Sequence, residues 1–141
     1  MPISVQVTRG LLTAQGERQI LPRLSQALLE VHGLADNPFM QRSVIAQLHV
    51  GEESSACVAG KSQSLAVIEV KVPSVTFRDR AVQQRFVEAA TNAVDELKAG
   101  SHPKERTFVS VSYAVDGAWG IAGKAYSNDD LGQAIAAAAG G

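Results

Sequence analysis

An apolar pattern in this sequence recurs 62 positions further along the chain. Apolar residues spaced three and four apart between positions 20 and 31 are typical of one buried face of a helix. The strand-like segments on either side follow the same offset, since residues 3–7 correspond to 65–69 and residues 45–50 correspond to 107–112. The matched helix positions are Ile20, Leu24, Ala27, Leu28 and Val31 in the first copy and Val82, Phe86, Ala89, Ala90 and Ala93 in the second.

Two copies of a strand–helix–strand unit predict an α/β (α+β) fold. The tandem βαβ units, at about 2–52 and 64–115, would form a four-stranded mixed sheet with two helices on one face and right-handed crossovers. The chain of 141 residues is then a single domain, 1–141, with a C-terminal extension over 116–141. Sequence identity between the copies is low, and two unrelated units of this kind would show a similar pattern, so the repeat bears on architecture only.

The individual elements follow from local signals. Strands are expected over 3–9, 44–50, 64–72 and 107–113, and long helices from a cap at Thr13 to a stop at Gly33 and over 78–98. Pro22 lies inside the first helix, which predicts a kink or a regular part that begins near Leu21. Residues 36–38 are expected to form a turn, 51–64 a polar loop and 118–126 a short irregular strand. A last helix is expected over 131–139, capped by Asn128 or Asp129.

The second face of such a sheet needs a cover. Residues 64–72 are almost continuously apolar, which is typical of a central strand buried on both faces. Apolar residues also occur on both phases of the neighbouring strands. We therefore expect another subunit to cover the face that the helices leave open.

Composition excludes several classes of function. The net charge is −1 without a basic run, which gives no electrostatic support for nucleic-acid binding. The sequence shows neither a leader that would indicate secretion nor an apolar run near 18 residues that would indicate a membrane span. A cytoplasmic protein is therefore expected. Cys57 is the only cysteine, and the three histidines are dispersed, so neither a disulfide nor a metal cluster is expected. A protein without metal or cofactor is the prediction.

The chain begins Met1-Pro2, followed by an alternating strand. Removal of Met1 would leave Pro2 with a secondary amine that this strand carries into the protein. An α-amino group has a reference pKa of about 7.7–8.0, and apolar surroundings lower the pKa of a cation. Such an amine would be suited to general acid–base catalysis near neutral pH. If Met1 is retained, the Pro2 nitrogen is a tertiary amide and cannot act as a base.

Met1-Pro2, the two βαβ units and the late segment from Asp116 to Lys124, Asp-Gly-Ala-Trp-Gly-Ile-Ala-Gly-Lys, together resemble the tautomerase superfamily over about 2–126. That family includes 4-oxalocrotonate tautomerase, macrophage migration inhibitory factor and malonate semialdehyde decarboxylase, and the late Trp-Gly segment looks most like the decarboxylase branch. The resemblance implies a homotrimer, Pro2 in a pocket near a subunit boundary, and proton transfer on enols and 2-oxo acids without metal or cofactor.

An anionic substrate needs a cation, ideally an arginine that binds a carboxylate through two hydrogen bonds. Arg42 lies just before the second strand and matches an arginine of 5-carboxymethyl-2-hydroxymuconate isomerase, so it ranks first. Family members that carry arginines after the third strand would place them near residues 72–74, where this chain has none. Lys71 and Arg78 are the available substitutes, and each of the three cations has a simple alternative as a solvated surface charge.

Three further side chains are candidates for substrate binding. His32 follows the first helix, as a histidine does in the cis-3-chloroacrylic acid dehalogenase of the family, and would otherwise interact with the helix dipole. Trp119 is expected to wall the pocket or to pack between subunits. Tyr113 would donate a hydrogen bond to a substrate oxygen or serve the sheet alone.

The sequence thus predicts a cofactor-independent tautomerase or isomerase that acts on a small carboxylate-bearing enol or 2-oxo acid, with Pro2 as general acid–base. One alternative is a hydratase-type dehalogenase or a decarboxylase on the same scaffold, which needs a second acid; Asp36 is the candidate. The other alternative is a non-catalytic trimeric interaction protein.

Overall fold

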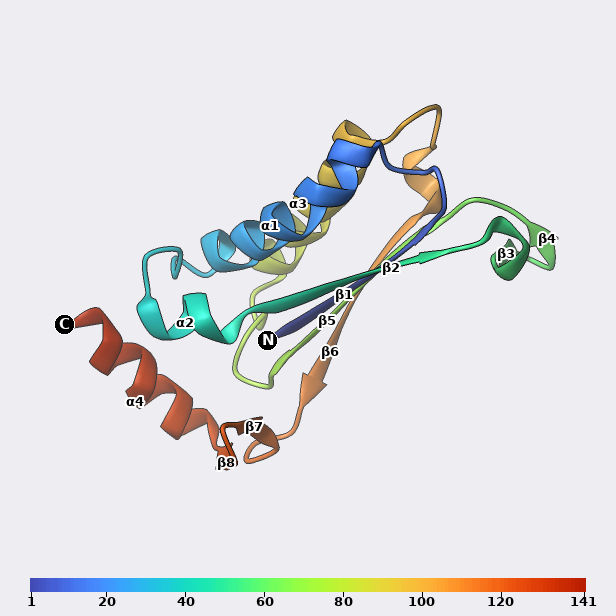
Figure 1. Ribbon diagram of the computed structural model, residues 1–141. Coiled ribbons are helices and arrows are strands. Elements are labelled where there is room, and N and C mark those ends of the chain that lie inside the picture. The colour runs from blue at the N-terminus through green and yellow to red at the C-terminus, as the bar shows by residue number, and fades with distance from the viewer.

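The computed structural model describes residues 1–141 and is built on a four-stranded mixed sheet with the strand order β2-β1-β5-β6 (Figure 1). Strand β1 (Pro2–Thr8) pairs in parallel with β2 (Ile45–Gly51), and β5 (Ala66–Pro73) pairs in parallel with β6 (Thr107–Ala114). The two halves join through the antiparallel pair β1–β5. Helices α1 (Ala14–Val31) and α3 (Arg80–Leu97) connect the parallel pairs and lie on one face of the sheet. The predicted fold class is confirmed.

Helix α1 begins where the sequence predicts. Its cap is Thr13, whose hydroxyl accepts a hydrogen bond of 2.8 Å from the amide of Gly16. The helix runs without interruption through Pro22, so the alternative start near Leu21 is wrong. Pro22 is exposed, and the carbonyl that lacks its partner can therefore be hydrated.

The core lies between the helices and one face of the sheet. Ile3, Val5 and Val7 of β1 are buried, but their counterparts in β5 are Ala66, Ile68 and Val70, which lie 63 positions later and not 62. The predicted equivalents at 65, 67 and 69 are therefore wrong by one residue. Because side chains alternate between faces along a strand, a slip of one residue exchanges the buried and exposed sets. The offset of 62 does hold for the helices, where Leu24 and Leu28 correspond to Phe86 and Ala90, all four of them fully buried.

Two short hairpins follow the second strand of each unit. Strands β3 (Cys57–Val58) and β4 (Lys61–Ser62) form one, and β7 (Trp119–Ile121) and β8 (Lys124–Tyr126) form the other. Each turn is an Ala-Gly pair with positive φ, 51° and 79° at Ala59-Gly60 and 51° and 81° at Ala122-Gly123, as two-residue hairpins require. The predicted loop over 51–64 and single strand over 118–126 are corrected accordingly, and the repeat extends through both Ala-Gly-Lys turns.

Among the short helices, α2 and the 3₁₀ turns were not predicted, whereas α4 was predicted with a later start. Residues 38–43 form α2 (Pro38–Ser43), because Asn37 caps it through a 3.1 Å hydrogen bond from the amide of Met40 and Pro38 occupies the first turn. Helix α4 (Asn128–Ala139) begins earlier than predicted, and Ser127 caps it in a reciprocal arrangement with Asp130. Short 3₁₀ turns cover Glu53–Ser55 and Lys104–Arg106.

Helices α2 and α4 lie at the end of the sheet where the chain begins (Figure 1). The side-chain amide of Asn37 donates a 3.0 Å hydrogen bond to the carbonyl of Ile135 and so joins the cap of α2 to α4. The ring of Phe39 packs against Tyr126 with centroids 6.2 Å apart. The C-terminal extension therefore covers the region around residue 1.

The sheet face opposite α1 and α3 is open in the single chain and mostly polar. Glu69 and Lys71 of β5 are exposed on it, so β5 is buried on one face only within the subunit. Across the sheet the same face carries exposed Ser110 and Ser112 of β6. Its large exposed apolar side chains are Ile45 and Phe108, which are 59% and 48% exposed. The prediction that the strands carry apolar residues on both faces of the sheet therefore holds only in part.

Substitution of two helical glycines by alanine should change the stability in opposite directions. A Cβ at Gly16 would lie 2.5 Å from the carbonyl oxygen of Leu97, whereas a Cβ at Gly132 would meet nothing within 4 Å. Gly16→Ala should therefore lower the free energy of unfolding by about 1–3 kcal/mol, as overpacking does. Gly132→Ala should raise it by about 0.8–1 kcal/mol through helix propensity. Urea unfolding of both variants checks this; equal effects would contradict the packing around Gly16.

Candidate active site

The first residue of the chain is buried. Met1 is 4% exposed, and its α-amino group donates a hydrogen bond to the carbonyl of Ser43. Burial lowers the pKa of this amine to about 5. The carbonyl of Met1 accepts a 3.2 Å hydrogen bond from the amide of Ile45. With Met1 present, the nitrogen of Pro2 is a tertiary amide; removal of Met1 would convert it into a secondary amine inside the protein.

A groove of about 370 Å³ surrounds this end of β1. Four of the predicted site residues line it together, and we call it the amine groove: Met1, Pro2, Arg42, Ser43, Lys71 and Trp119 are among its lining residues. The four predicted residues come from β1, α2, β5 and β7, so segments far apart in the sequence form one site.

Strand pairing explains why these residues meet. Pro2 lies opposite Ile45 in the parallel pair β1–β2, which brings Arg42, at the end of α2, to the start of β1. In the antiparallel pair β1–β5, Ile3 lies opposite Val70, so the next position along β5, Lys71, falls beside Pro2 on the open face. Trp119 reaches the groove because the β7–β8 hairpin follows β6 directly.

Both cations of the groove are free to bind an anion. Neither Arg42 nor Lys71 takes part in any of the ion pairs within the chain. The guanidinium of Arg42 lies 5.4 Å from the centroid of the Phe39 ring, which fixes its position without neutralising its charge. Two unpaired positive charges beside Pro2 favour a carboxylate ligand.

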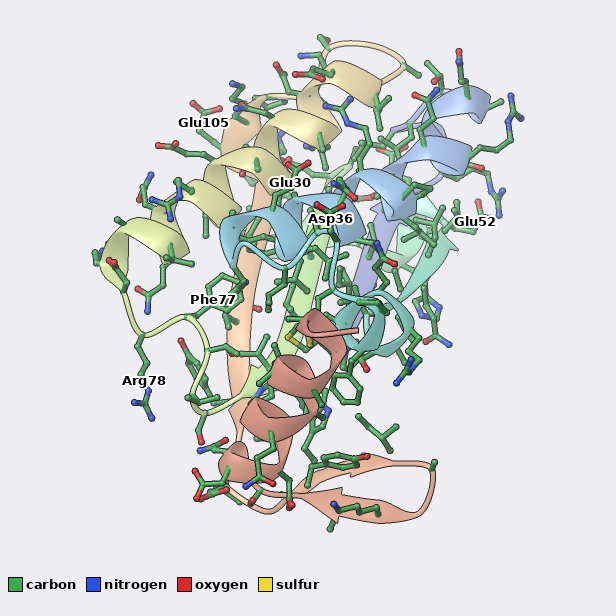
Figure 2. The ribbon with its side chains drawn as sticks, turned by 90° about the vertical axis from the view of Figure 1, so that its left-hand side faces the viewer. Glu30, Asp36, Glu52, Phe77, Arg78 and Glu105 are labelled. Carbon is green, nitrogen blue, oxygen red and sulfur yellow. The ribbon has the colours of Figure 1, made fainter.

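Arg78 and Tyr113 are not among the residues that line the groove. Arg78 is exposed in the loop between β5 and α3, where Figure 2 shows it pointing away from the molecule while Phe77 turns inward. Its Nε donates only a long hydrogen bond of 3.5 Å, to the carbonyl of Ser74. The hydroxyl of Tyr113 donates a 3.2 Å hydrogen bond to the carbonyl of Phe77, so it holds this loop against β6.

His32 lies at the end of α1 and is not among the lining residues of the amine groove either. Its Nδ1 lies 2.9 Å from the carbonyl oxygen of Leu28, so Nδ1 carries the proton and donates. Its Nε2 is buried without a hydrogen-bond partner. The ring packs edge-on against Phe77 with centroids 4.6 Å apart. His32 therefore closes the helix in the way its position after α1 indicated.

A second cavity adjoins the groove on the side of the helices. We call it the apolar chamber: it measures about 210 Å³, its exposed wall is almost wholly apolar, and Met1, His32, Phe39, Trp119, Leu131 and Ile135 are among its lining residues. Met1, Ser43 and Trp119 line both the chamber and the amine groove. Met1 is thus part of the wall between the two spaces.

Two residues near the site were not predicted from the sequence. Ser43 takes part through its backbone carbonyl, for which no sequence signal exists. Glu69 lines a further groove of about 330 Å³ on the open face, together with Pro2 and Lys71. Its place two residues before Lys71 on the same face of β5 was the available signal. Asp36, the acid suggested instead, lies in the loop between α1 and α2 (Figure 2) and is not among the residues that line either groove or the chamber.

No three His, Cys, Asp or Glu side chains gather where they could hold a metal ion. None of the helices combines the length and the apolarity that crossing a bilayer requires.

Comparison with solved structures shows which fold this is. A fused 4-OT, wild type and described as a symmetric trimer, superimposes with a TM-score of 0.75 at 20% identity, over 94% of this chain and 99% of that one. Pt0534, inactivated by 2-oxo-3-pentynoate, gives a TM-score of 0.74 at 21% identity with the same coverage. FG41 malonate semialdehyde decarboxylase, inhibited by 3-bromopropiolate, gives 0.64 at 20% identity, over 86% and 88% of the chains.

The macrophage migration inhibitory factor of Toxoplasma gondii also has this fold, with a TM-score of 0.69 at 13% identity over 89% of this chain and all of the other. No protein-family model and no curated protein sequence matches the chain. The chain therefore has the fold of the tautomerase superfamily, as the sequence resemblance predicted, and identities of this size establish the fold alone.

Proposed function

We propose that the protein is a cofactor-independent tautomerase or isomerase that moves a proton on a small enol or 2-oxo acid. The observation that carries the proposal is the convergence of Pro2, Arg42, Lys71 and Trp119 on one groove. An amine at Pro2, freed by removal of Met1, is the general acid–base. Arg42 and Lys71 bind the carboxylate of the substrate.

The proton transfer needs only these groups. In ketonisation, the enol O–H loses its proton, the carbonyl forms, and carbon 3 gains a proton; the Pro2 nitrogen accepts one proton and returns one. Apolar surroundings and nearby cations both disfavour a protonated amine, and such a base near neutral pH is effective in general acid–base catalysis. The carboxylate is held while the proton moves, so orientation adds to the rate.

The proposed assembly is a homotrimer. The helices leave one sheet face open, and that face carries the exposed Ile45 and Phe108. One of the structures that this chain resembles is described as a symmetric trimer. Association through the open face would bury these apolar side chains and would place the groove on Pro2 and Glu69 at a subunit boundary.

One observation favours a second chemistry at Pro2. Glu69 and Pro2 line a common space on the open face, so a carboxylate is available to activate water for hydration, or to take part in decarboxylation, of a small unsaturated or 3-oxo acid. This alternative requires Glu69, whereas tautomerisation does not. If the Pro2 amine has no catalytic activity, the protein is instead a non-catalytic trimer.

Hydrogen–deuterium exchange at carbon 3 of pyruvate and phenylpyruvate in D₂O tests the proposal. Protein whose N-terminus is shown by mass spectrometry to be Pro2 should catalyse exchange, and Pro2→Ala should lose it by about 10²–10⁴-fold, the usual contribution of a positioned acid–base. Glu69→Gln should leave exchange intact. Exchange at the rate of buffer alone, or equal rates in Pro2→Ala, would overturn the proposal.

A further inference from the structure

Met1 is enclosed by parts of the chain that are synthesised after it. Its α-amino group donates a hydrogen bond to the carbonyl of Ser43, and its own carbonyl accepts one of 3.2 Å from the amide of Ile45. Its side chain is part of the hydrophobic core and lines the apolar chamber. The amine, the carbonyl and the side chain of Met1 are therefore all engaged within the folded protein.

Helix α4 completes this enclosure. Leu131 is the buried residue of the helix and lines the chamber together with Ile135. The side-chain amide of Asn37 joins the carbonyl of Ile135 to α2. At the other end of the helix, the side-chain amide of Asn128 donates a 3.0 Å hydrogen bond to the hydroxyl of Ser74, in the loop after β5. The helix is therefore held near both of its ends beside the chamber that Met1 lines.

Removal of an N-terminal methionine requires access to its amine and to its peptide bond. A methionine aminopeptidase binds the free α-amine; water adds to the carbonyl carbon of Met1, the bond to the Pro2 nitrogen breaks, and that nitrogen takes up a proton. In the folded protein the amine and the carbonyl oxygen are both hydrogen-bonded to residues 43–45. Excision therefore requires the start of β1 to separate from β2 and the Met1 side chain to leave the core, and this opening costs free energy.

The order of synthesis leaves an interval in which Met1 is accessible. The residues that bond its backbone lie in the middle of the sequence, whereas Leu131 and Ile135 of α4 lie near its end. Ile135 follows Ile45 by about 90 residues, which take roughly 5–20 s to synthesise at about 5–20 residues per second. Until α4 has been made and has docked, the chamber around Met1 is incomplete, and an aminopeptidase can compete with folding for the N-terminus.

We propose that Met1 is removed only from the nascent chain, and that a chain which folds with Met1 in place retains it because α2 and α4 enclose it. The fraction of protein with a free Pro2 amine is then fixed during synthesis, by competition between the aminopeptidase and the docking of α4. That the retained form is inactive rests on the proposed function, whereas the protection of Met1 by the fold does not.

Incubation of the purified Met1 form with methionine aminopeptidase tests this protection, with the release of methionine followed by mass spectrometry. A synthetic peptide of residues 1–9 has the same cleavage site without the fold and serves as the reference substrate. Methionine should leave the folded protein at least about 100-fold more slowly than the peptide, because cleavage follows the small population of opened molecules. Release at the rate of the peptide would overturn the proposal.

Two leucine variants separate the role of α4 from that of overall stability. Leu131→Ala loosens α4 beside Met1, whereas Leu24→Ala removes the same atoms from a fully buried position of α1 that does not line the chamber. A cooperative urea transition first shows that each variant is folded. Leu131→Ala should accelerate the release of methionine by at least about 10-fold, since it weakens the local packing of α4, and Leu24→Ala should have a smaller effect. Equal rates in the two variants would overturn the role of α4.

Equilibrium unfolding gives a readout that depends on neither catalysis nor the aminopeptidase. Protein that begins at Pro2 lacks a buried side chain of the core, so it should unfold at a lower urea concentration than the Met1 form. An equal or higher midpoint would contradict the enclosure of Met1. Protection of Met1 together with an inactive Pro2 form would overturn the proposed function and support the enclosure, whereas rapid release from an otherwise active protein would do the reverse.

Discussion

Protein that retains Met1 should show no catalysis above the background rate, whereas protein that begins at Pro2 should be active. The expected difference in kcat/KM is about 10²–10⁴-fold, the contribution of a general acid–base. The reason is chemical, since an amide nitrogen has no basic lone pair and Met1 makes Pro2 an amide. Met1 also occupies the wall between the amine groove and the apolar chamber, so its presence narrows the site as well.

Misfolding would not explain a loss of activity in the protein that retains Met1. Met1 is accommodated in the core, and its amine donates to the carbonyl of Ser43, so the retained form is a folded protein. Expression with methionine aminopeptidase inhibited yields that form, and expression with the aminopeptidase active should restore activity in proportion to the fraction that mass spectrometry shows to begin at Pro2. Full activity with Met1 in place would refute a role for the Pro2 amine.

The fold could be predicted because its signals are local and repeated. Apolar periodicity located the four main strands and both long helices within a few residues of their observed bounds. The register of the β1–β5 equivalence failed because Leu65 and Val67 are as apolar as Ala66 and Ile68, so periodicity alone did not show which phase faces the core. Only the pairing of β5 with β1 decides that.

The short elements failed for a different reason. Helix α2 has six residues, too few for an apolar period, and only the Asn37-Pro38 start signal indicated it. Both hairpins have an Ala-Gly turn, in which the alanine has a positive φ. The residue pairs that usually indicate such a turn in a sequence are Asn-Gly and Gly-Gly. Helix α2 and the β7–β8 hairpin contribute residues to the lining of both the chamber and the amine groove.

Which of the candidate cations lie beside Pro2 could not be predicted from the sequence either. Arg42, Lys71 and Arg78 all lie near a strand end, and only the family resemblance ranked Arg42 first. The pairing of β1 with β2 and β5 brings Arg42 and Lys71 to Pro2, whereas the loop after β5 turns Phe77 into the core and Arg78 outward. Which residue of a loop faces inward depends on tertiary packing and cannot be predicted from residue spacing.

The Arg42→Ala variant should raise the KM for 2-oxo acids by about 10-fold, with little change in kcat, because a hydrogen-bonded charge contributes about 1.5–3 kcal/mol and the exposure of Arg42 places it at the low end through screening. Binding that is equal in the ground state and the transition state alters KM alone. Arg42→Lys keeps the charge but not the two-pronged geometry, and should fall between wild type and Arg42→Ala.

The matched control is Arg78→Ala, which removes the same charge from a side chain that points away from the molecule and does not line the groove. Its KM should equal that of wild type. Raising the salt concentration should increase the wild-type KM and have less effect on Arg42→Ala, because the interaction that salt screens is already absent there. An equal rise of KM in both arginine variants would mean that the effect is the general field of the protein, and Arg42 would then have no place in the site.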